Sequence, residues 1–388
     1  MATEEKPARI ETVLSQAGSR WDALTGAVAM PIYQTATFRH PALGQSTGFD
    51  YSRTTNPTRQ ALEQTMAALE GGARGFAFAS GLAAIDAALH LVPSGTRLAV
   101  TEDLYGGTFR LLERVYRGRG IAVDYVDTSH VENVERALAA GARAVFVESL
   151  TNPLLKVASV RAIADVAREH HALLIVDSTF LTPYLQQPLG LGADVVVHSA
   201  SKYLGGHNDV VAGLIVARTA ELAERLAFYQ NAVGGVLGPQ DSWLLLRGLK
   251  TLAVRLDRQQ ANAQAVAEWL TKHPRVRRVY YPGLASDPGH AVLAEQSRGF
   301  GGMVSFEIDD PLRVPGVLES VRVFLFAESL GGVESLITYP IVQTHADIDA
   351  ATRDRLGIND RLLRLSIGLE HVDDLIADLD LALAAGGR

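Results

Sequence analysis

The chain has 388 residues, of which 47% are hydrophobic, so it is long enough for more than one hydrophobic core. A formal net charge of −7 argues against nucleic acid or an anionic membrane surface as partner, and no apolar run approaches the ~20 residues that span a bilayer. Cysteine is absent, which excludes disulfides and thiolate metal sites, and the charged N-terminus lacks an apolar signal core, so we expect a cytoplasmic protein.

Residues 1–50 show little regular pattern and are rich in Gly, Pro, Thr and aromatic residues, so we expect an extended arm that lies on another surface. Asn56 as a cap and Pro57 at the first helical position predict a helix that ends near Gly71. Apolar runs then alternate with helical stretches near 105–120, 131–140 and 159–170. The runs that we expect as strands are 76–80, 97–103, 121–127, 142–149, 172–178, 194–199 and 212–217.

These strands are apolar on both faces, which is typical of a parallel sheet covered by helices on both sides. The pattern predicts an α/β doubly wound core. A helical stretch near 241–272 leads into a second, smaller α/β part with strands at 278–283, 302–308 and 362–368. We therefore divide the chain into an arm (1–50), a large domain (51–245) and a C-terminal domain (246–388).

The most informative segment is DVVVHSASKYLGGHN, residues 194–208. A buried strand runs into a turn with Ser199, Ser201 and Lys202, followed by two glycines. A lysine at a strand end beside small hydroxyl residues can hold an aldehyde cofactor as a Schiff base, with the hydroxyls on a phosphate. The alternative interpretation is a surface lysine before a glycine turn.

Four further motifs support a cofactor site. In FASGLAAIDAAL, the N–H groups of Gly81 and Leu82 start a helix and can bind an anion, although the segment also fits an ordinary turn between strand and helix. Asp177 ends a buried strand, where it can hold a protonated pyridine nitrogen or cap a loop. Tyr105, before two glycines, can stack on a flat cofactor or simply pack. Tyr51 and Arg53 precede a helix, and Arg53 suits a phosphate.

Two further polar residues stand out, of which Arg364 suggests a buried carboxylate ligand. Asn152 follows a strand in ESLTNP, and Arg364 lies on an apolar strand, where an arginine is unusual unless it holds a buried anion or is on an edge strand. The sequence contains no metal-binding motif such as H-E-x-x-H and no phosphate-binding G-x-x-x-x-G-K-[ST] motif. We interpret His198 and His207, which flank Lys202, as structural residues or as residues that support those in contact with the cofactor.

Taken in order, YSRxxNPT, SGLAA, YGGT, TNP, VDSTF, HSASKYLGGH, AESLGGVESL and RLSIGLE resemble the Cys/Met-metabolism (trans-sulfuration) family of pyridoxal-phosphate enzymes from about residue 28 to the C-terminus. The resemblance implies the aspartate-aminotransferase fold (fold type I) and pyridoxal 5'-phosphate (PLP) as cofactor. It also implies small amino-acid substrates, and a homotetramer of two tight dimers with shared active sites, in which the arm contacts the neighbouring subunit.

The resemblance also implies roles for individual residues. Lys202 matches the Schiff-base lysine, Asp177 the partner of the pyridinium nitrogen, and Tyr105 the ring-stacking tyrosine. The phosphate ligands are implied to be Gly81, Leu82, Ser199 and Ser201, with Tyr51 and Arg53 from the neighbouring subunit. The implied substrate ligands are Asn152, Ser329 and Arg364 for the α-carboxylate, and Glu328 and Arg110 for the distal end.

The chain departs from the family pattern at Leu82, Ser178 and Ser201, where Met, Asn and Thr are usual. Gly107 stands where methionine γ-lyases carry Cys, and Glu328 stands where one bacterial type of cystathionine β-lyase carries Tyr. The resemblance therefore favours the cystathionine γ-synthase reaction, in which cysteine replaces the acyl group of an O-acylhomoserine. Cystathionine γ- or β-lyase and O-acetylhomoserine sulfhydrylase stay open as alternatives.

Overall fold

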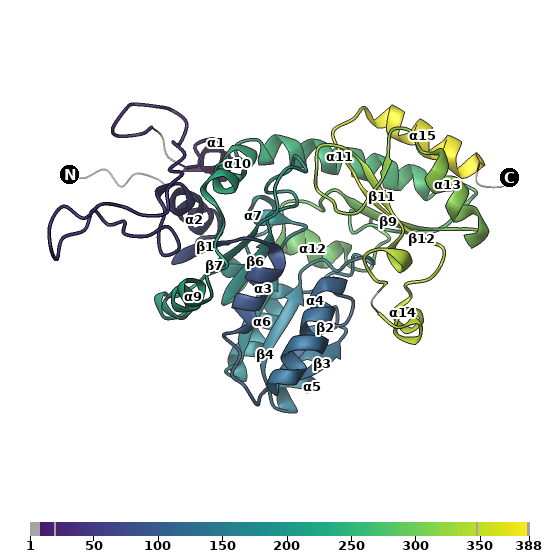
Figure 1. Ribbon diagram of the computed structural model, residues 1–388. Helices are drawn as coiled ribbons and strands as arrows, with labels where there is room; N and C mark the ends of the chain where they lie inside the picture. Colours follow the sequence, from purple (N-terminus) through teal and green to yellow (C-terminus); the bar gives the residue numbers. More distant parts are fainter. Residues whose placement is uncertain (1–7, 19–20, 347, 386–388) are drawn as a thin grey trace, which may run out of the picture.

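Two β-sheets of unequal size organise the computed structural model, which describes residues 8–18, 21–346 and 348–385 (Figure 1). The larger sheet has the strand order β1-β7-β6-β5-β4-β2-β3. Its strands are β1 (Arg74–Phe78), β2 (Arg97–Thr101), β3 (Ala122–Val126), β4 (Ala142–Glu148), β5 (Leu173–Asp177), β6 (Val195–Ser199) and β7 (Gly213–Ala217). Strand β7 is antiparallel to β1 and β6, and the other neighbours are parallel. The predicted α/β fold with a mostly parallel sheet is confirmed.

Both faces of this sheet are buried. Along β4, Val145 and Val147 join one hydrophobic cluster, whereas Ala144 and Phe146 join the other. One face is covered by α2 (Pro57–Glu70), α5 (Val131–Ala139) and α6 (Val160–Glu169), and the other by α3 (Gly81–Leu89), α4 (Gly106–Leu111) and α9 (Ala220–Val233). The continuous apolar runs in the sequence follow from this double coverage.

Two expected helices are interrupted. The 105–120 stretch forms α4, then a π-helical turn, η1 (Leu112–Tyr116), and a 3₁₀ turn, η2 (Arg117–Arg119). The 241–272 stretch forms α10 (Pro239–Leu249) and α11 (Leu252–Leu270). The break follows from capping at the end of α10, because the Gly248 carbonyl accepts bonds from the Thr251 N–H and from the Arg255 guanidinium.

The smaller sheet has the order β10-β11-β12-β9-β8 and is covered by α11, α13 (Val314–Ser320) and α15 (Val372–Ala385). Its strands are β8 (Val276–Tyr280), β9 (Met303–Ile308), β10 (Leu325–Phe326), β11 (Leu336–Thr338) and β12 (Leu362–Ser366). In Figure 1, the long helix α11 runs from the larger sheet to the smaller one. The remaining helices are α1 (Ile10–Ser15), α7 (Thr182–Leu185), α8 (Pro188–Leu191), α12 (His290–Gln296), η3 (Pro311–Arg313), η4 (Pro340–Val342) and α14 (Ala350–Leu356).

Ahead of α2, the chain forms α1 and long loops that project away from the body (Figure 1). Several large apolar side chains in these loops are exposed, among them Trp21, Leu24 and Leu43. Contact of this arm with a neighbouring subunit stays a prediction, as do the domain limits, of which 245/246 falls within α10. No helix among the described residues is long and apolar enough to cross a membrane.

Candidate active site

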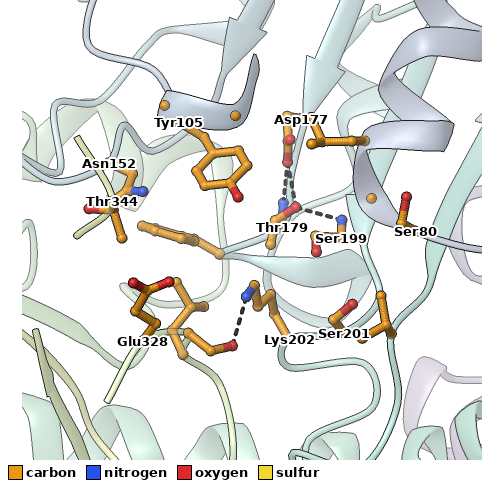
Figure 2. A pocket seen from close by; sticks show the side chains of 18 of the residues that line it. Ser80, Tyr105, Asn152, Asp177, Thr179, Ser199, Ser201, Lys202, Glu328 and Thr344 are labelled. Atoms are coloured by element: carbon orange, nitrogen blue, oxygen red, sulfur yellow. Dashed lines mark hydrogen bonds between the residues drawn. The ribbon is translucent and has the colours of Figure 1, made fainter. Parts of the chain in front are cut away.

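A cavity of about 780 Å³ lies at the carboxyl ends of the parallel strands, and the smaller sheet closes one side of it (Figure 2). Parallel strands bring their carboxyl ends to one edge of a sheet, which is where ligands of open α/β sheets bind. Of the sequence-predicted site residues, Tyr51 and Arg53 are absent from the lining. The others all line it: Gly81, Leu82, Tyr105, Arg110, Asn152, Asp177, Ser199, Ser201, Lys202, Glu328, Ser329 and Arg364.

Lys202 follows β6 in a short turn, and its Nζ donates a hydrogen bond to Ser329 Oγ at 2.7 Å (Figure 2). Burial and, to a smaller extent, the Arg364 charge lower the pKa of Lys202 to about 8, against the opposing effect of Glu328. A lysine with such a pKa is a neutral amine, the nucleophilic form, more often than an ordinary lysine is.

The start of α3 forms an anion site beside this lysine. Ser80 caps the helix, since its side chain accepts the Ala83 N–H at 3.1 Å, and the amides of Gly81 and Leu82 lie in the first turn. A Cβ at position 81 would lie 2.9 Å from Ser199 Oγ, so glycine allows α3 to begin directly against the end of β6. Amides and hydroxyls at a helix start fit a phosphate.

Asp177 ends β5 and is held by the residue two positions on. Its Oδ1 accepts the Thr179 N–H at 2.9 Å and the Thr179 hydroxyl at 2.5 Å, and Thr179 Oγ1 accepts the Ser199 N–H at 2.8 Å (Figure 2). Burial raises the pKa of Asp177, and the bonds from Thr179 act in the opposite direction. A cation beside Asp177, such as a protonated ring nitrogen, would stabilise the ionised carboxylate.

Arg364 is the buried cation of the cavity, with an exposed fraction of 1%. From β12, its guanidinium donates to Asn152 Oδ1 at 2.7 Å and to the Ser329 carbonyl at 3.0 Å. Among the described residues, nothing accepts a hydrogen bond from its Nε. Burial lowers the pKa of Arg364 to about 10. A buried guanidinium with an unused donor fits a carboxylate ligand.

Tyr105 stands at the entrance to α4 with 40% of its surface exposed. A Cβ at Gly107 would collide with the Tyr105 ring, so the glycine determines how the ring lies. Two exposed charged residues of opposite sign, Arg110 from α4 and Glu328 from the segment after β10, complete the polar lining of the cavity.

Tyr51 and Arg53 lie elsewhere on the chain. Arg53 contacts the backbone carbonyl and the side chain of Asn231 near the end of α9, and both Tyr51 and Arg53 are exposed. The structure therefore does not bring these two residues to the cavity of their own chain. Their predicted service to a neighbouring subunit stays a prediction.

The polar residues that line the cavity and that sequence reasoning missed are Ser80, Glu148, Thr179, Asn208, Gln343 and Thr344. Thr179 carries a signal that would have found it, because a hydroxyl residue two positions after a strand-end aspartate commonly bonds back to the carboxylate. Nothing in the sequence singles out Glu148, since its place depends on which strand lies beside β4.

A model of the family described as "Cys/Met metabolism PLP-dependent enzyme" matches residues 11–384. The chain belongs to this family. The amine of Lys202, the anion site of α3 and the carboxylate of Asp177 surround one cavity, so the residues present fit an aldehyde, a phosphate and a ring nitrogen. The cofactor is therefore pyridoxal 5'-phosphate, and the protein is a PLP-dependent trans-sulfuration enzyme that forms or breaks C–S bonds.

Similar proteins with different names cover almost the whole chain. A cystathionine β-lyase of Lactococcus lactis subsp. cremoris is 51% identical over 96% of this chain and 98% of its own length. A cystathionine γ-lyase of Bacillus subtilis (strain 168) is 50% identical over the same shares. The structure of cystathionine γ-synthase from Xanthomonas oryzae pv. oryzae in complex with cystathionine superposes with a TM-score of 0.96 at 43% identity, covering 98% of this chain and 99% of that one.

Proposed function

We propose that this enzyme catalyses γ-replacement, in which cysteine attacks an O-acylhomoserine to give cystathionine. The C–O bond at Cγ breaks and releases the acyl group as a carboxylate. A C–S bond to cysteine forms, and the thiol proton passes to solvent. When bound, PLP supplies an electron sink for the carbanions of such a reaction.

One observation carries the proposal: a single residue connects the amine with the carboxylate site. Ser329 accepts from Lys202 Nζ through its hydroxyl and from Arg364 through its carbonyl. An amino acid whose carboxylate binds Arg364 would therefore present its Cα near Lys202. A free Lys202 amine could take the proton from Cα, pass it on, and then remove a proton from Cβ, which opens the way to departure of the γ-substituent.

The charges near the cavity opening suit cystathionine, whose far end carries an ammonium and a carboxylate. Glu328 would attract the ammonium and Arg110 the carboxylate. Tyr105 lines the cavity immediately before α4 and would assist proton transfer at the entering or leaving group. Arg110 and Glu328 would therefore favour cystathionine, with its zwitterionic distal end, over methionine, which ends in an uncharged thioether.

Cleavage of cystathionine is the second candidate, since the 51% and 50% identical relatives are named as lyases. The same distal contacts would bind cystathionine as substrate instead of product. Cleavage would release a 2-oxo acid, ammonia and either cysteine or homocysteine.

A side-by-side assay separates the two candidates. The enzyme receives O-acetyl- or O-succinylhomoserine with cysteine in one reaction and cystathionine alone in the other. We expect a higher kcat/KM for cystathionine formation than for release of 2-oxo acid. The opposite order would establish the lyase. Glu328→Ala and Arg110→Ala should each lower kcat/KM about ten- to hundred-fold with substrates that have a charged distal end. Rapid breakdown of methionine, unchanged in these variants, would contradict the distal contacts.

A further inference from the structure

Glu148 is a buried carboxyl that joins two separate segments of the active site. It is the last residue of β4, it is 5% exposed, and it lines the cavity. Its Oε1 accepts the backbone N–H of Tyr105 at 2.7 Å, and the backbone amide of Asn152 also bonds to this carboxyl. One side chain therefore holds the turn before α4 and the segment after β4.

The backbone of Glu148 is itself fixed. Its N–H donates to Thr101 Oγ1 at 3.2 Å, and Thr101 Oγ1 lies 2.9 Å from Thr128 Oγ1. Both threonines are buried. The carboxyl thus extends from a fixed strand end to a turn and a loop, which is the arrangement that positioning requires.

Glu148 also lies beside Asp177. The two residues are register partners on the neighbouring parallel strands β4 and β5, so their side chains leave the same face of the sheet, with the strands about 4.8 Å apart. A buried carboxyl and a half-buried one on neighbouring strands do not ionise together without a large cost. Burial raises the pKa of Glu148 well above its usual range, and the charges of Asp177 and Asp103 add to this effect.

We propose that Glu148 is a positioning residue that, as a neutral carboxyl, fixes the backbone of Tyr105 and Asn152 around the cofactor while Asp177 carries the negative charge. A protonated carboxyl suffices for this role because its carbonyl oxygen accepts amide hydrogen bonds. This role of Glu148 requires bound PLP, the cofactor of the family. Only the action of Tyr105 and Asn152 on the substrate rests on the proposed function.

Two substitutions with side chains of similar size test whether position 148 needs a hydrogen-bond acceptor. Glu148→Gln keeps a carbonyl oxygen but cannot ionise, and Glu148→Leu removes the acceptor. The holoenzymes are compared by the visible circular dichroism of the bound cofactor, by the rate of cofactor loss on dialysis and by kcat/KM. The Gln variant should stay close to the wild type in all three. The Leu variant should show a changed dichroism, cofactor loss faster by about tenfold or more, and kcat/KM lower by about 100-fold.

Asp378→Leu is the matched control. Asp378 is 6% exposed and accepts three backbone N–H groups, from Arg322, Val323 and Phe324, but it does not line the cavity. Its loss should lower the melting temperature without altering the cofactor signals. If Glu148→Gln is as impaired as Glu148→Leu, the charge matters and the proposal is wrong. Cofactor signals unchanged in Glu148→Leu would also overturn it. These signals need no substrate, so they stand even if the enzyme proves to be a lyase.

Discussion

At the scale of single residues, Lys202 shows how the cavity sets the reactivity of an amine. Its pKa falls from 10.5 to about 8, chiefly through burial, and the charges of Arg364 and Glu328 act in opposite directions. At pH 7 roughly a tenth of such an amine is neutral, against well under one part in a thousand for an ordinary lysine. Capture of an aldehyde at neutral pH therefore depends on this environment.

The pH dependence of cofactor capture follows from these charges. We expect the rate at which the apoenzyme binds PLP, followed by visible absorbance, to rise with pH and level off with a midpoint of about 8. Removing a negative charge disfavours the protonated amine, so Glu328→Gln should shift the midpoint downward. Removing a positive charge has the opposite effect, so Arg364→Met should shift the midpoint upward.

Lys202→Ala controls for capture by other lysines and should give no stable absorbance band after free PLP is removed. A midpoint near the usual lysine value would contradict the role of burial. Shifts of the same sign in Glu328→Gln and Arg364→Met would show that the two variants act through structure and not through charge.

The sequence reveals those site residues whose chemical character differs from that of the residues around them. Arg364 on an apolar strand and Lys202 beside glycines are conspicuous in the sequence alone. Glu148 is not, because a glutamate at a strand end has many roles. Its neighbours Tyr105 and Asp177 become apparent only once the strand order β5-β4-β2 is known.

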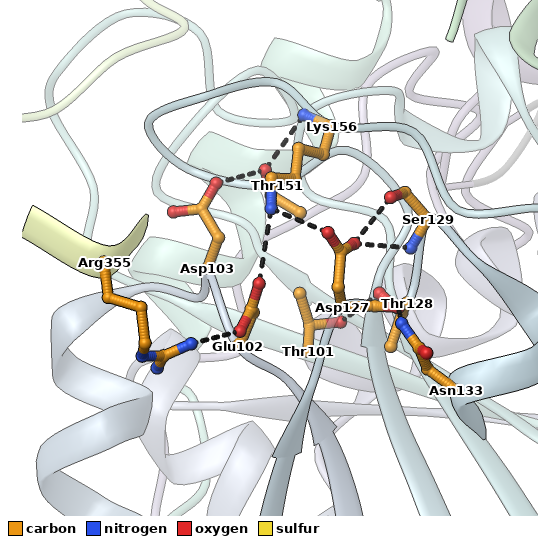
Figure 3. Close-up of polar contacts among 10 residues, drawn as sticks. All are labelled: Thr101, Glu102, Asp103, Asp127, Thr128, Ser129, Asn133, Thr151, Lys156 and Arg355. Atoms are coloured by element: carbon orange, nitrogen blue, oxygen red, sulfur yellow. Dashed lines mark hydrogen bonds and ion pairs between the residues drawn. The ribbon is translucent and has the colours of Figure 1, made fainter. Parts of the chain in front are cut away.

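At the scale of elements, the segment after β4 carries Asn152 and is anchored by the side chain of Lys156 (Figure 3). Lys156 Nζ lies 3.3 Å from Glu102 Oε1, just after β2, and 2.9 Å from Asp127 Oδ2, just after β3. Asp103 joins this cluster and bonds to Thr151 at 2.6 Å. Lys156 thus holds the segment against two carboxylates, and the Thr151 hydroxyl holds it against a third.

Lys156→Met should destabilise the protein because it leaves the carboxylates to repel one another. Burial raises the pKa of Asp103 to about 6, while the charge of Lys156 opposes that rise. Without Lys156, the folded-state pKa of Asp103 rises further above its unfolded value, and the pKa of Asp127, which Lys156 helps to hold below its usual range, rises too, so the folded variant binds more protons than the folded wild type. Its loss of stability, about 1–3 kcal/mol at pH 7 by denaturant unfolding, should therefore shrink as the pH falls toward 5.

Arg355→Met provides the comparison for the same cluster. Arg355 in α14 pairs with Glu102 at 2.7 Å, but its side chain is 57% exposed. A pair so open to solvent contributes at most about 1 kcal/mol, and salt screens it. Equal effects of the two substitutions, or a loss in Lys156→Met that grows toward pH 5, would contradict the account.

The sequence predicted the elements of the larger sheet to within about two residues, since strands buried on both faces leave continuous apolar runs. It did not predict β10 or β11, which have two and three residues, or the short helices around the smaller sheet. Strands of two or three residues contain at most one and a half periods of a strand pattern, and helices of seven residues contain fewer than two helical turns. Tertiary contacts decide the limits of such segments, as the bond from Arg255 to the Gly248 carbonyl does at the end of α10.

At the scale of the whole molecule, the active site exists only where the two sheets meet. Arg364 from the smaller sheet bonds to Asn152 from the segment after β4, and His345 Nε2 lies 2.8 Å from the Asn152 carbonyl. Burial lowers the pKa of His345 to about 4, so this contact is made by a neutral imidazole. If Arg364 and Asn152 bind the substrate carboxylate as we propose, neither half of the chain can bind it alone.

The same reasoning extends to the assembly, for which we propose a homotetramer of two tight dimers. The arm exposes apolar side chains, and Arg53 lies against Asn231 instead of in its own cavity. If Tyr51 and Arg53 bind the phosphate of a neighbouring subunit, each active site needs two chains. A dimer that pairs Arg53→Ala with Lys202→Ala then contains one site with both residues intact.

Mixing these two inactive variants tests for shared sites. After the subunits exchange at equal concentration, half of the dimers are mixed and each has one intact site of two. Activity should therefore return to about a quarter of the wild-type value. Arg53→Ala mixed with Arg53→Ala,Lys202→Ala should recover none, because no dimer then holds an intact pair. If native mass spectrometry confirms mixed dimers and activity still does not return, Arg53 serves its own chain or no site at all, and the shared-site assembly is wrong.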